Sequence, residues 1–342
     1  MKRVFSICLV LILALTTFAF AGCTPKDDNS SKTETPTTQE STTDKKVKIG
    51  IIKIVEHASL DTIEQSTIKQ LETLGYVNGQ NAEITALSAQ GDPTNVASMM
   101  DSFIANGTDI VVAITTPVAS VAINYADQIP VIFSAVSNPV AAGLTTTLEK
   151  PDKNVTGTCD AVPVEKILDL ALETVTDIKT VGFIYNPGEA SSVANIDNAK
   201  AYLDSKKIKY VESSVDSSAG IQQAAESLVT KCDVIFTPTD NTVAEGMAVL
   251  SQVTVDSKKP CFVGADSMVK DGGLATIGIK YEDLGTETAN MVQKVLTGTK
   301  VADIPVYVFD DLSTYINKSV ATSVGITFSD EILNSDKTVV FE

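Results

Sequence analysis

The stretch IVVAITTP, residues 110–117, decides the fold. Its first five residues are apolar and mostly β-branched, which predicts a strand. Thr116 and Pro117 then predict the start of a helix, because Thr is a good N-cap and Pro suits the first helical turn. A strand that leads directly into a helix is the repeating unit of a parallel α/β sheet.

The same alternation of strands and helices runs along the chain from Val47 onward. Strands are predicted at 47–52, 82–87, 110–114 and 131–133, with helical spacing between them. After a crossover near 155–160 the pattern restarts, with helices at 164–175, 192–203, 221–229 and 243–253 and strands at 181–185, 209–212, 234–236, 261–263 and 275–279. A helix at 284–296 and a strand at 305–309 follow.

Two similar halves predict an α/β, two-lobed fold in which each lobe is a doubly wound parallel sheet flanked by helices. The elements after residue 279 are too few for a third domain, so they are assigned to the first lobe. The predicted segments are a signal peptide at 1–22, a lipidated flexible tether at 23–46, a first lobe at 47–158 with 281–310, a second lobe at 159–280, and a C-terminal segment at 311–342 that crosses the hinge.

Cys23 follows a sequence with the features of a secretory signal. Lys2 and Arg3 give a positive start, an apolar run extends to Phe20, and small residues precede the cysteine. The stretch resembles the bacterial lipobox, which implies cleavage before Cys23 and lipidation of that residue. The protein is then expected at the outer face of the cell membrane, held by its lipid anchor and a polar tether. The alternative is an ordinary secreted protein with a chance cysteine.

The composition argues against several classes of ligand and of catalytic site. The formal net charge of −17 argues against nucleic acid, whose phosphates need a basic face. The single histidine, His57, excludes a metal site built on several histidines, and a Ser-His-Asp site would have to use His57 with Asp61. Neither a P-loop nor a dinucleotide motif occurs. We therefore expect no metal, no cofactor and no enzymatic activity.

Polar residues follow the ends of the predicted strands in both lobes. In open parallel sheets, ligands bind beyond the carboxyl ends of the strands, where loops and helix N-termini meet. Two such lobes place these ends around one cleft. The candidate ligand-binding residues are Glu56, His57, Thr115, Thr116, Pro117, Ser134, Ala135, Ser137, Asn138, Tyr185, Asn186, Thr239, Asp240, Asn241 and Asp266.

The chemistry of these residues suits a zwitterion. The helix start at Pro117 offers N–H groups and a positive dipole end to a carboxylate, and neighbouring hydroxyls add donors. The carboxylates of Glu56, Asp240 and Asp266 are able to pair with an ammonium group, although each alone could equally be an N-cap. The candidates for stacking on a flat side chain of the ligand are Tyr185, Phe133 or Tyr281.

Six stretches resemble a known family. They are IVEHASLD (54–61), AQGD (89–92), TTPVA (115–119), SNPVAAGL (137–144), NVTGT (154–158) and PTDNTVA (238–244). The chain is similar through them to the substrate-binding lipoproteins of bacterial ABC importers of the tryptophan/tyrosine type. The resemblance implies a type I periplasmic-binding-protein fold with three crossovers, a free and often aromatic amino acid as ligand, and a membrane permease and a cytosolic ATPase as partners.

The expected mechanism is capture by closure, in which a ligand gains partners on both lobes and shifts a hinge equilibrium. Hinge candidates lie near 158–160, 279–281 and 310–311. Tyrosine and tryptophan are not separated by the sequence, and the hydroxyl-rich cleft favours tyrosine. Two other functions stay open for such a Gram-positive surface lipoprotein: an adhesin that binds host cells, alone or in addition to transport, and a sensor that presents its ligand to a membrane kinase.

Overall fold

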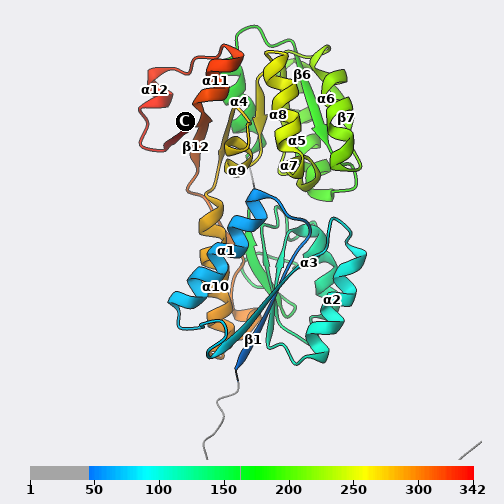
Figure 1. Ribbon diagram of the computed structural model, residues 1–342, viewed down its shortest axis with the longest axis vertical. Coiled ribbons are helices and arrows are strands. Elements are labelled where there is room, and N and C mark those ends of the chain that lie inside the picture. Colours follow the sequence, from blue (N-terminus) through cyan, green and yellow to red (C-terminus); the bar gives the residue numbers. More distant parts are fainter. Residues whose placement is uncertain (1–45, 162) are drawn as a thin grey trace, which may run out of the picture. The chain divides into compact units, whose positions relative to one another are not determined.

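The computed structural model describes residues 46–161 and 163–342, which belong to one compact unit. The predicted signal peptide, Cys23 and all of the predicted tether except Lys46 lie outside the described residues. Within this unit, Figure 1 shows two sheets, each with helices on both faces. Among the described helices, none combines the length and the apolar character that a membrane span requires.

The first sheet has six strands, all paired in parallel, in the order β11-β5-β4-β3-β1-β2. The strands are β1 (Val47–Lys53), β2 (Ala82–Ser88), β3 (Ile110–Ile114), β4 (Val131–Ser134), β5 (Val155–Cys159) and β11 (Tyr307–Val308). On one face lie α1 (Ala58–Thr73) and α10 (Tyr281–Leu296), and on the other α2 (Thr94–Ala105) and α3 (Thr116–Ala122) (Figure 1). The strand IVVAI is therefore central, and it is buried throughout.

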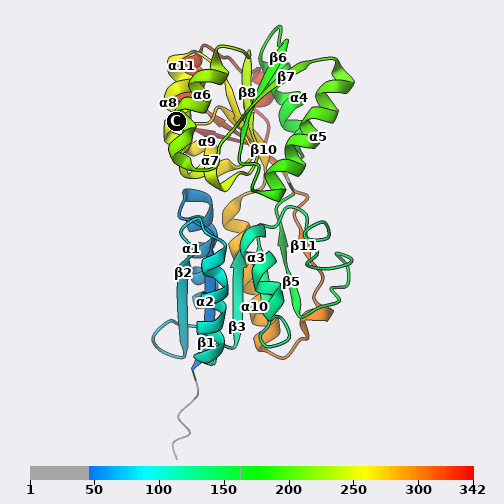
Figure 2. The ribbon, with the colours of Figure 1, turned by 90° about the vertical axis from the view of Figure 1, so that its right-hand side faces the viewer.

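The second sheet has seven strands in the order β13-β12-β10-β9-β8-β6-β7. The strands are β6 (Thr180–Tyr185), β7 (Lys209–Ser214), β8 (Val234–Thr237), β9 (Cys261–Val263), β10 (Ala275–Gly278), β12 (Ser313–Asn317) and β13 (Thr338–Phe341). The helices α4 (Val164–Thr174) and α5 (Ala190–Lys206) lie on one side, and α6 (Ile221–Val229) and α8 (Met247–Asp256) on the other, as Figure 2 shows. Phe183, Phe236 and Phe262 are fully buried in its core.

Two predictions for the second lobe need correction. The helix expected at 243–253 is divided at Gly246 into α7 (Asn241–Glu245) and α8. Gly246 also packs closely against α6, where a Cβ would lie 2.3 Å from Cδ1 of Ile221. The helix α9 (Asp266–Lys270) was not predicted, since it is only five residues long. Such short helices carry too few residues for a periodic pattern.

The C-terminal segment does more than cross between the sheets. The chain passes from β11 in the first sheet to β12 in the second over residues 309–312, and residues beyond this point extend the second sheet. There β12 is antiparallel to β10, and β13 is parallel to β12. With α11 (Lys318–Val324) and α12 (Asp330–Leu333), these strands make most of 311–342 part of the second lobe. The other connections between the sheets follow β5 and β10.

A close contact fixes the direction of α1, whose first turn reaches the other sheet's helices. Gly285 in α10 lies against α1, where an added Cβ would be 2.0 Å from Oγ of Ser66 and 2.5 Å from the carbonyl oxygen of Ile63. The hydroxyl of Thr67 donates to the carbonyl of Gly285 at 3.2 Å. Only glycine permits this approach, so the α1–α10 packing holds the N-terminal turn of α1 in place.

Candidate functional site

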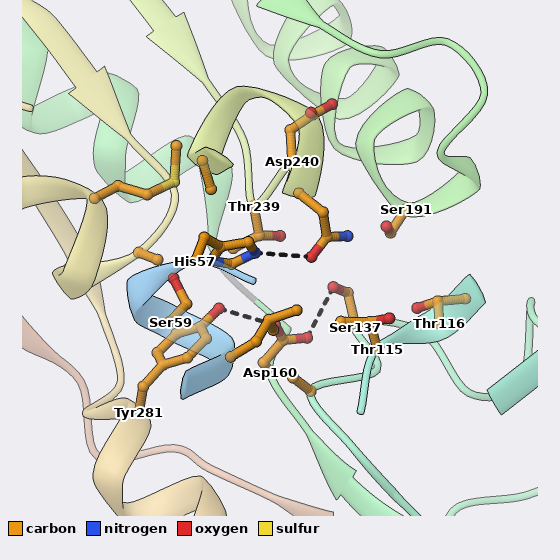
Figure 3. Close-up of a pocket in the computed structure, with 16 residues that line it drawn as sticks. His57, Ser59, Thr115, Thr116, Ser137, Asp160, Ser191, Thr239, Asp240 and Tyr281 are labelled. Carbon is orange, nitrogen blue, oxygen red and sulfur yellow. Dashed lines mark hydrogen bonds between the residues drawn. The ribbon is translucent and has the colours of Figure 1, made fainter. Parts of the chain in front are cut away.

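A pocket lies where strand ends of both sheets meet (Figure 3). Its lining comes from both sheets and from two of the crossovers. The lining residues are His57, Ser59, Leu60, Thr115, Thr116, Ala135, Ser137, Asp160, Ser191, Thr239, Asp240, Asn241, Ala244, Ala265, Met268 and Tyr281.

The structure brings together many of the residues predicted from the strand ends. The candidates that line the pocket are His57, Thr115, Thr116, Ala135, Ser137, Thr239, Asp240 and Asn241. Of the three aromatic residues considered for stacking, Tyr281 lines it. Phe133 is fully buried in the core, and the phenol of Tyr185 donates to Glu212 at 2.8 Å. The rule that ligands meet the carboxyl ends of parallel strands therefore found much of this pocket.

Other candidates lie outside the lining for identifiable reasons. Glu56 is exposed, and the exposed Asn138 accepts the N–H of Ala141 at 3.0 Å within its own turn. Ser134 is buried inside the sheet, 3.1 Å from the hydroxyl of Thr158. Pro117 sits in the first turn of α3 without lining the pocket.

The remaining two candidates serve local structure in the second lobe. Asn186 donates from Nδ2 to the hydroxyl of Thr242 at 2.8 Å and accepts the N–H of Gly188 at 2.8 Å. Asp266 is buried at the start of α9, and its carboxylate accepts the N–H of Ser267 at 2.8 Å. Burial raises the pKa of Asp266 to about 6. Neither side chain is among the lining residues.

Lining residues that were not selected are Ser59, Leu60, Asp160, Ser191, Ala244, Ala265, Met268 and Tyr281. Asp160 directly follows β5, so the strand-end rule applied to the crossover would have found it. Tyr281 is the first residue of α10 and follows the second crossover. The other lining residues lie in the first turns of helices or in short loops. Whether their side chains face the pocket depends on how the two lobes meet, and no local sequence pattern contains this.

Two strand ends in the first sheet carry unusual backbone. Thr115, after β3, has φ 87° and ψ 158°, and Ala135, after β4, has φ 55°. A residue with a Cβ rarely occupies such a conformation, and strain of this kind clusters at binding and active sites. Thr115 is the N-cap of α3, but its side chain makes no capping hydrogen bond. Its hydroxyl is thus available to the pocket.

Three buried side-chain atoms of the lining lack a hydrogen-bond partner within the described chain: Nδ1 of His57 and Oγ1 of Thr115 and Thr239. Most buried polar atoms in proteins are hydrogen-bonded, because an unsatisfied buried donor or acceptor costs about 1–3 kcal/mol. Three such atoms around one cavity indicate a site shaped for a polar ligand.

His57 connects the two sides of the pocket. Asn241 donates from Nδ2 to Glu189 at 2.5 Å, which orients its Oδ1 toward Nε2 of His57 at 3.2 Å. Nε2 therefore carries the proton, and the neutral ring leaves Nδ1 as an acceptor. Burial lowers the pKa of His57. A second link joins the hydroxyls of Ser59 in α1 and Ser267 in α9.

Two buried carboxylates stabilise the pocket side of the second lobe. Glu189 accepts the N–H groups of Asn241 at 3.1 Å and Thr242 at 3.0 Å. Asp240 accepts the N–H groups of Val243 at 2.9 Å and Asn186 at 2.7 Å, so it caps α7. Burial, and then the negative charge of Glu189, raise the pKa of Asp240. In Figure 3 the carboxyl group of Asp240 points away from the centre of the pocket.

Asp160 has the opposite orientation. Its carboxylate accepts the hydroxyl of Ser137 at 2.8 Å and the phenol of Tyr281 at 3.0 Å, and both partners line the pocket (Figure 3). Burial raises the pKa of Asp160. Among the described residues, no cluster of three His, Cys, Asp or Glu has a geometry that could hold a metal ion.

The chain is similar to known proteins over most of its length. Residues 48–340 match the family model of the ABC transporter substrate binding protein. The chain is 35% identical over 317 residues to the tyrosine-binding protein of Clostridioides difficile (strain R20291), covering 93% of this chain and 90% of the relative.

Solved structures are similar over most of the chain. An ABC domain from Streptococcus pneumoniae in complex with L-Trp has a TM-score of 0.81 at 35% identity, covering 86% of this chain and all of the other. The ligand-free, open structure of a Clostridium difficile substrate-binding protein with adhesive properties has a TM-score of 0.66 at 37% identity, covering 86% and 99%. The predicted periplasmic-binding-protein-like fold is confirmed, and the chain belongs to the ABC transporter substrate-binding protein family.

Proposed function

We propose that this protein is the substrate-binding component of an ABC importer and that it captures a free aromatic amino acid, tyrosine or tryptophan, between its two sheets. The observation that carries the proposal is the pocket lined from both sheets, with buried polar atoms of His57, Thr115 and Thr239 that have no partner in the described chain. A ligand with a carboxylate, an ammonium group and a flat apolar side chain supplies partners for such a lining.

The apolar part of the lining suits an aromatic ring. Leu60, Met268 and Tyr281 are buried and face the same pocket as the polar atoms. Flexible thioether and aromatic side chains pack well against rings. Two relatives point to the same class of ligand, since one is named for tyrosine and the other was solved with L-Trp.

Closure of the two lobes is the proposed mechanism. The structure has a higher TM-score with the L-Trp complex, 0.81, than with the ligand-free open relative, 0.66, although both relatives are similarly identical in sequence. The contacts His57–Asn241 and Ser59–Ser267 join the lobes directly. A ligand that binds residues of both lobes favours this closed arrangement over an open one.

The role proposed here is binding rather than catalysis. His57 shares its Nε2 with Asn241, and Asp61 is held by Lys53 at 2.5 Å, so the residues that a Ser-His-Asp site would need are otherwise engaged. After closure, the loaded protein would deliver its ligand to a permease driven by an ATPase. The lipid anchor at Cys23 would keep it at the outer face of the membrane, near that permease.

A thermal-shift screen of the twenty amino acids tests the proposal, with sugars and nucleosides as controls. We expect L-tyrosine or L-tryptophan to raise the melting temperature most, because a ligand that binds only the native state stabilises it. Isothermal titration should then give one site per chain. A sugar or nucleoside that raises the melting temperature while no amino acid does so would contradict the proposal.

Adhesion is a second candidate function, favoured by the similarity to a relative with adhesive properties at 37% identity. It requires an exposed surface and is compatible with transport. Binding of the purified protein to host cells, measured with and without the amino acid, tests it. Binding no stronger than that of an unrelated acidic protein would remove this candidate.

A further inference from the structure

Asp160 occupies an unusual position, on a connection between the two sheets. It directly follows β5, and its exposed fraction is 4%. Its carboxylate accepts a hydrogen bond from Tyr281, the first residue of α10, which lies just beyond the connection that follows β10. The other partner, Ser137, belongs to the loop after β4. One carboxylate therefore ties together two connections and one wall of the pocket.

Within residues 46–161 and 163–342, this carboxylate has no cationic partner. The pocket lining contains neither lysine nor arginine. The ion pairs in the described part of the chain, such as Lys53 with Asp61 and Glu64, do not include Asp160. A buried carboxylate without a counter-ion is costly, whereas each oxygen retains capacity for a further hydrogen bond. The geometry suits a cation that comes from outside the chain.

The other buried carboxylate of the lining is already engaged. Both oxygens of Asp240 accept backbone N–H groups, from Val243 and Asn186, and the group points away from the cavity in Figure 3. Asp160 receives its hydrogen bonds from two residues that themselves line the pocket. The two acids thus differ in direction, although both are buried.

We propose that Asp160 anchors the amino group of the bound ligand and that Tyr281, as a positioning residue, links this contact to a second connection between the sheets. The inference rests on the proposed amino-acid ligand and names the residue that recognises its ammonium group. An ammonium that pairs with Asp160 stabilises the arrangement of two connections at once. Occupation of the pocket is thereby coupled to the segments about which the lobes would turn.

A cycle of ligands and variants tests this proposal. Affinities for L-tyrosine and L-tryptophan are compared by titration calorimetry with those for 3-(4-hydroxyphenyl)propionate and indole-3-propionate, which lack the amino group. We expect the wild-type chain from Lys46 onward to prefer the amino acid by about 10- to 100-fold, the scale of a hydrogen bond between charged groups. In Asp160→Asn this preference should fall to about threefold or less.

The matched control is Asp266→Asn, which makes the same chemical change at a buried carboxylate outside the lining. Its preference for the amino acid should equal that of the wild type. A full preference in Asp160→Asn, or its loss in Asp240→Asn alone, would overturn the assignment. If neither amino acid binds the wild-type chain, the proposed function falls together with this inference.

Tyr281→Phe tests the positioning role and serves if Asp160→Asn does not fold. This variant keeps the ring and removes only the phenol that donates to Asp160. We expect the preference for the amino acid to fall about three- to tenfold while the affinity for the propionates changes little, because only the orientation of the carboxylate is affected. Equal losses for both ligand classes would show a general packing effect and overturn the role of Tyr281.

Discussion

The two sides of the pocket use polar residues in different ways. The first wall, formed by His57, Ser59, Thr115 and Ser137, includes strained backbone at Thr115 and two polar atoms that have no partner among the residues the structure describes. The second wall, formed by Ser191, Thr239, Asp240 and Asn241, is built around a short helix whose N–H groups are satisfied by Asp240 and Glu189.

The difference shows that a buried polar residue at a strand end has one of two roles. In the second wall, carboxylates stabilise the local fold, and Oγ1 of Thr239 is the one lining atom of that wall among the unpartnered atoms of the described chain. In the first wall, hydrogen-bonding capacity is left for a ligand. Mutations in the two walls should therefore separate stability from affinity.

The largest expected effect is on stability, in the second wall. Asp240→Ala removes the N-cap of α7 and leaves the half-buried N–H of Asn186 without its acceptor. We expect the free energy of unfolding to fall by about 2–4 kcal/mol, measured by urea denaturation. The exposed Asp336→Ala is the control and should change it by less than about 0.5 kcal/mol. An Asp240→Ala variant as stable as the wild type would show that its capping contacts contribute nothing.

A change in the first wall should act on affinity instead. Thr115→Val removes a hydroxyl that has no partner in the part of the chain that the structure describes, and it keeps the shape of the side chain. We expect affinity for the amino acid to fall about tenfold with no loss of stability, because the hydroxyl bonds only to the ligand.

The control for this substitution is Thr237→Val. The hydroxyl of Thr237 is also buried without a partner in the described chain, but it lies outside the pocket lining. The affinity of the Thr237→Val variant for the amino acid should equal that of the wild type. Equal losses of affinity in Thr115→Val and Thr237→Val would show that an unpartnered hydroxyl in the pocket lining does not differ from one outside it.

The contact between the walls gives a smaller effect. Ser59→Ala removes one side of the hydroxyl pair with Ser267. The closed arrangement should lose part of its stabilisation, so affinity should fall about two- to fivefold through faster ligand release. Stopped-flow fluorescence measures this rate, and Ser267→Ala should give a similar change. A slower release in either variant would contradict a stabilising role for the pair.

The smallest effect concerns pH and His57. Burial lowers the pKa of His57 below 6.5, and the positive charge of Lys53 lowers it further. The hydrogen bond with Asn241 and the negative charges of Asp61 and Glu245 raise it by a smaller amount. Because the neutral ring is favoured in the closed form, that form should be most stable above pH 6.5 and lose stability as pH falls through the lowered pKa.

The NMR titration of this single histidine measures the effect, in the wild type and in Ser59→Ala. We expect the pKa to lie below 6.5 in the wild type and to move toward 6.5 when the walls separate more readily. A pKa above 6.5 in the wild type would show that His57 is not shielded between the walls.

The sequence predicts the positions of this site better than the roles of its residues. Strand ends such as Thr115 and Asp240 were found because parallel strands bring their carboxyl ends to one edge. The direction of the Asp240 carboxyl group follows from the contact of its loop with Asn186, 54 residues away in sequence, which no local pattern contains. Asp160 was interpreted only as part of a hinge, although it lies both there and in the pocket.

The fold was predictable where periodic patterns were long. The strand at 110–114 is a continuous apolar run and occurs as expected, and the helix expected at 284–296 occurs as α10, which begins three residues earlier. The strands β12 and β13 lie at an edge of the second sheet and are short and partly exposed, so their residues form no continuous apolar run. Assignment of 311–342 to that sheet required the tertiary pairing of β12 with β10.

A crystal structure of the protein grown with L-tyrosine or L-tryptophan tests the central claim most directly. Our account predicts the amino acid between the two walls, with its nitrogen within about 3.2 Å of an Asp160 carboxylate oxygen and its carboxylate at the hydroxyl of Thr115. An amino acid bound elsewhere, or one whose nitrogen contacts Asp240 or another group of the pocket instead of Asp160, would contradict it.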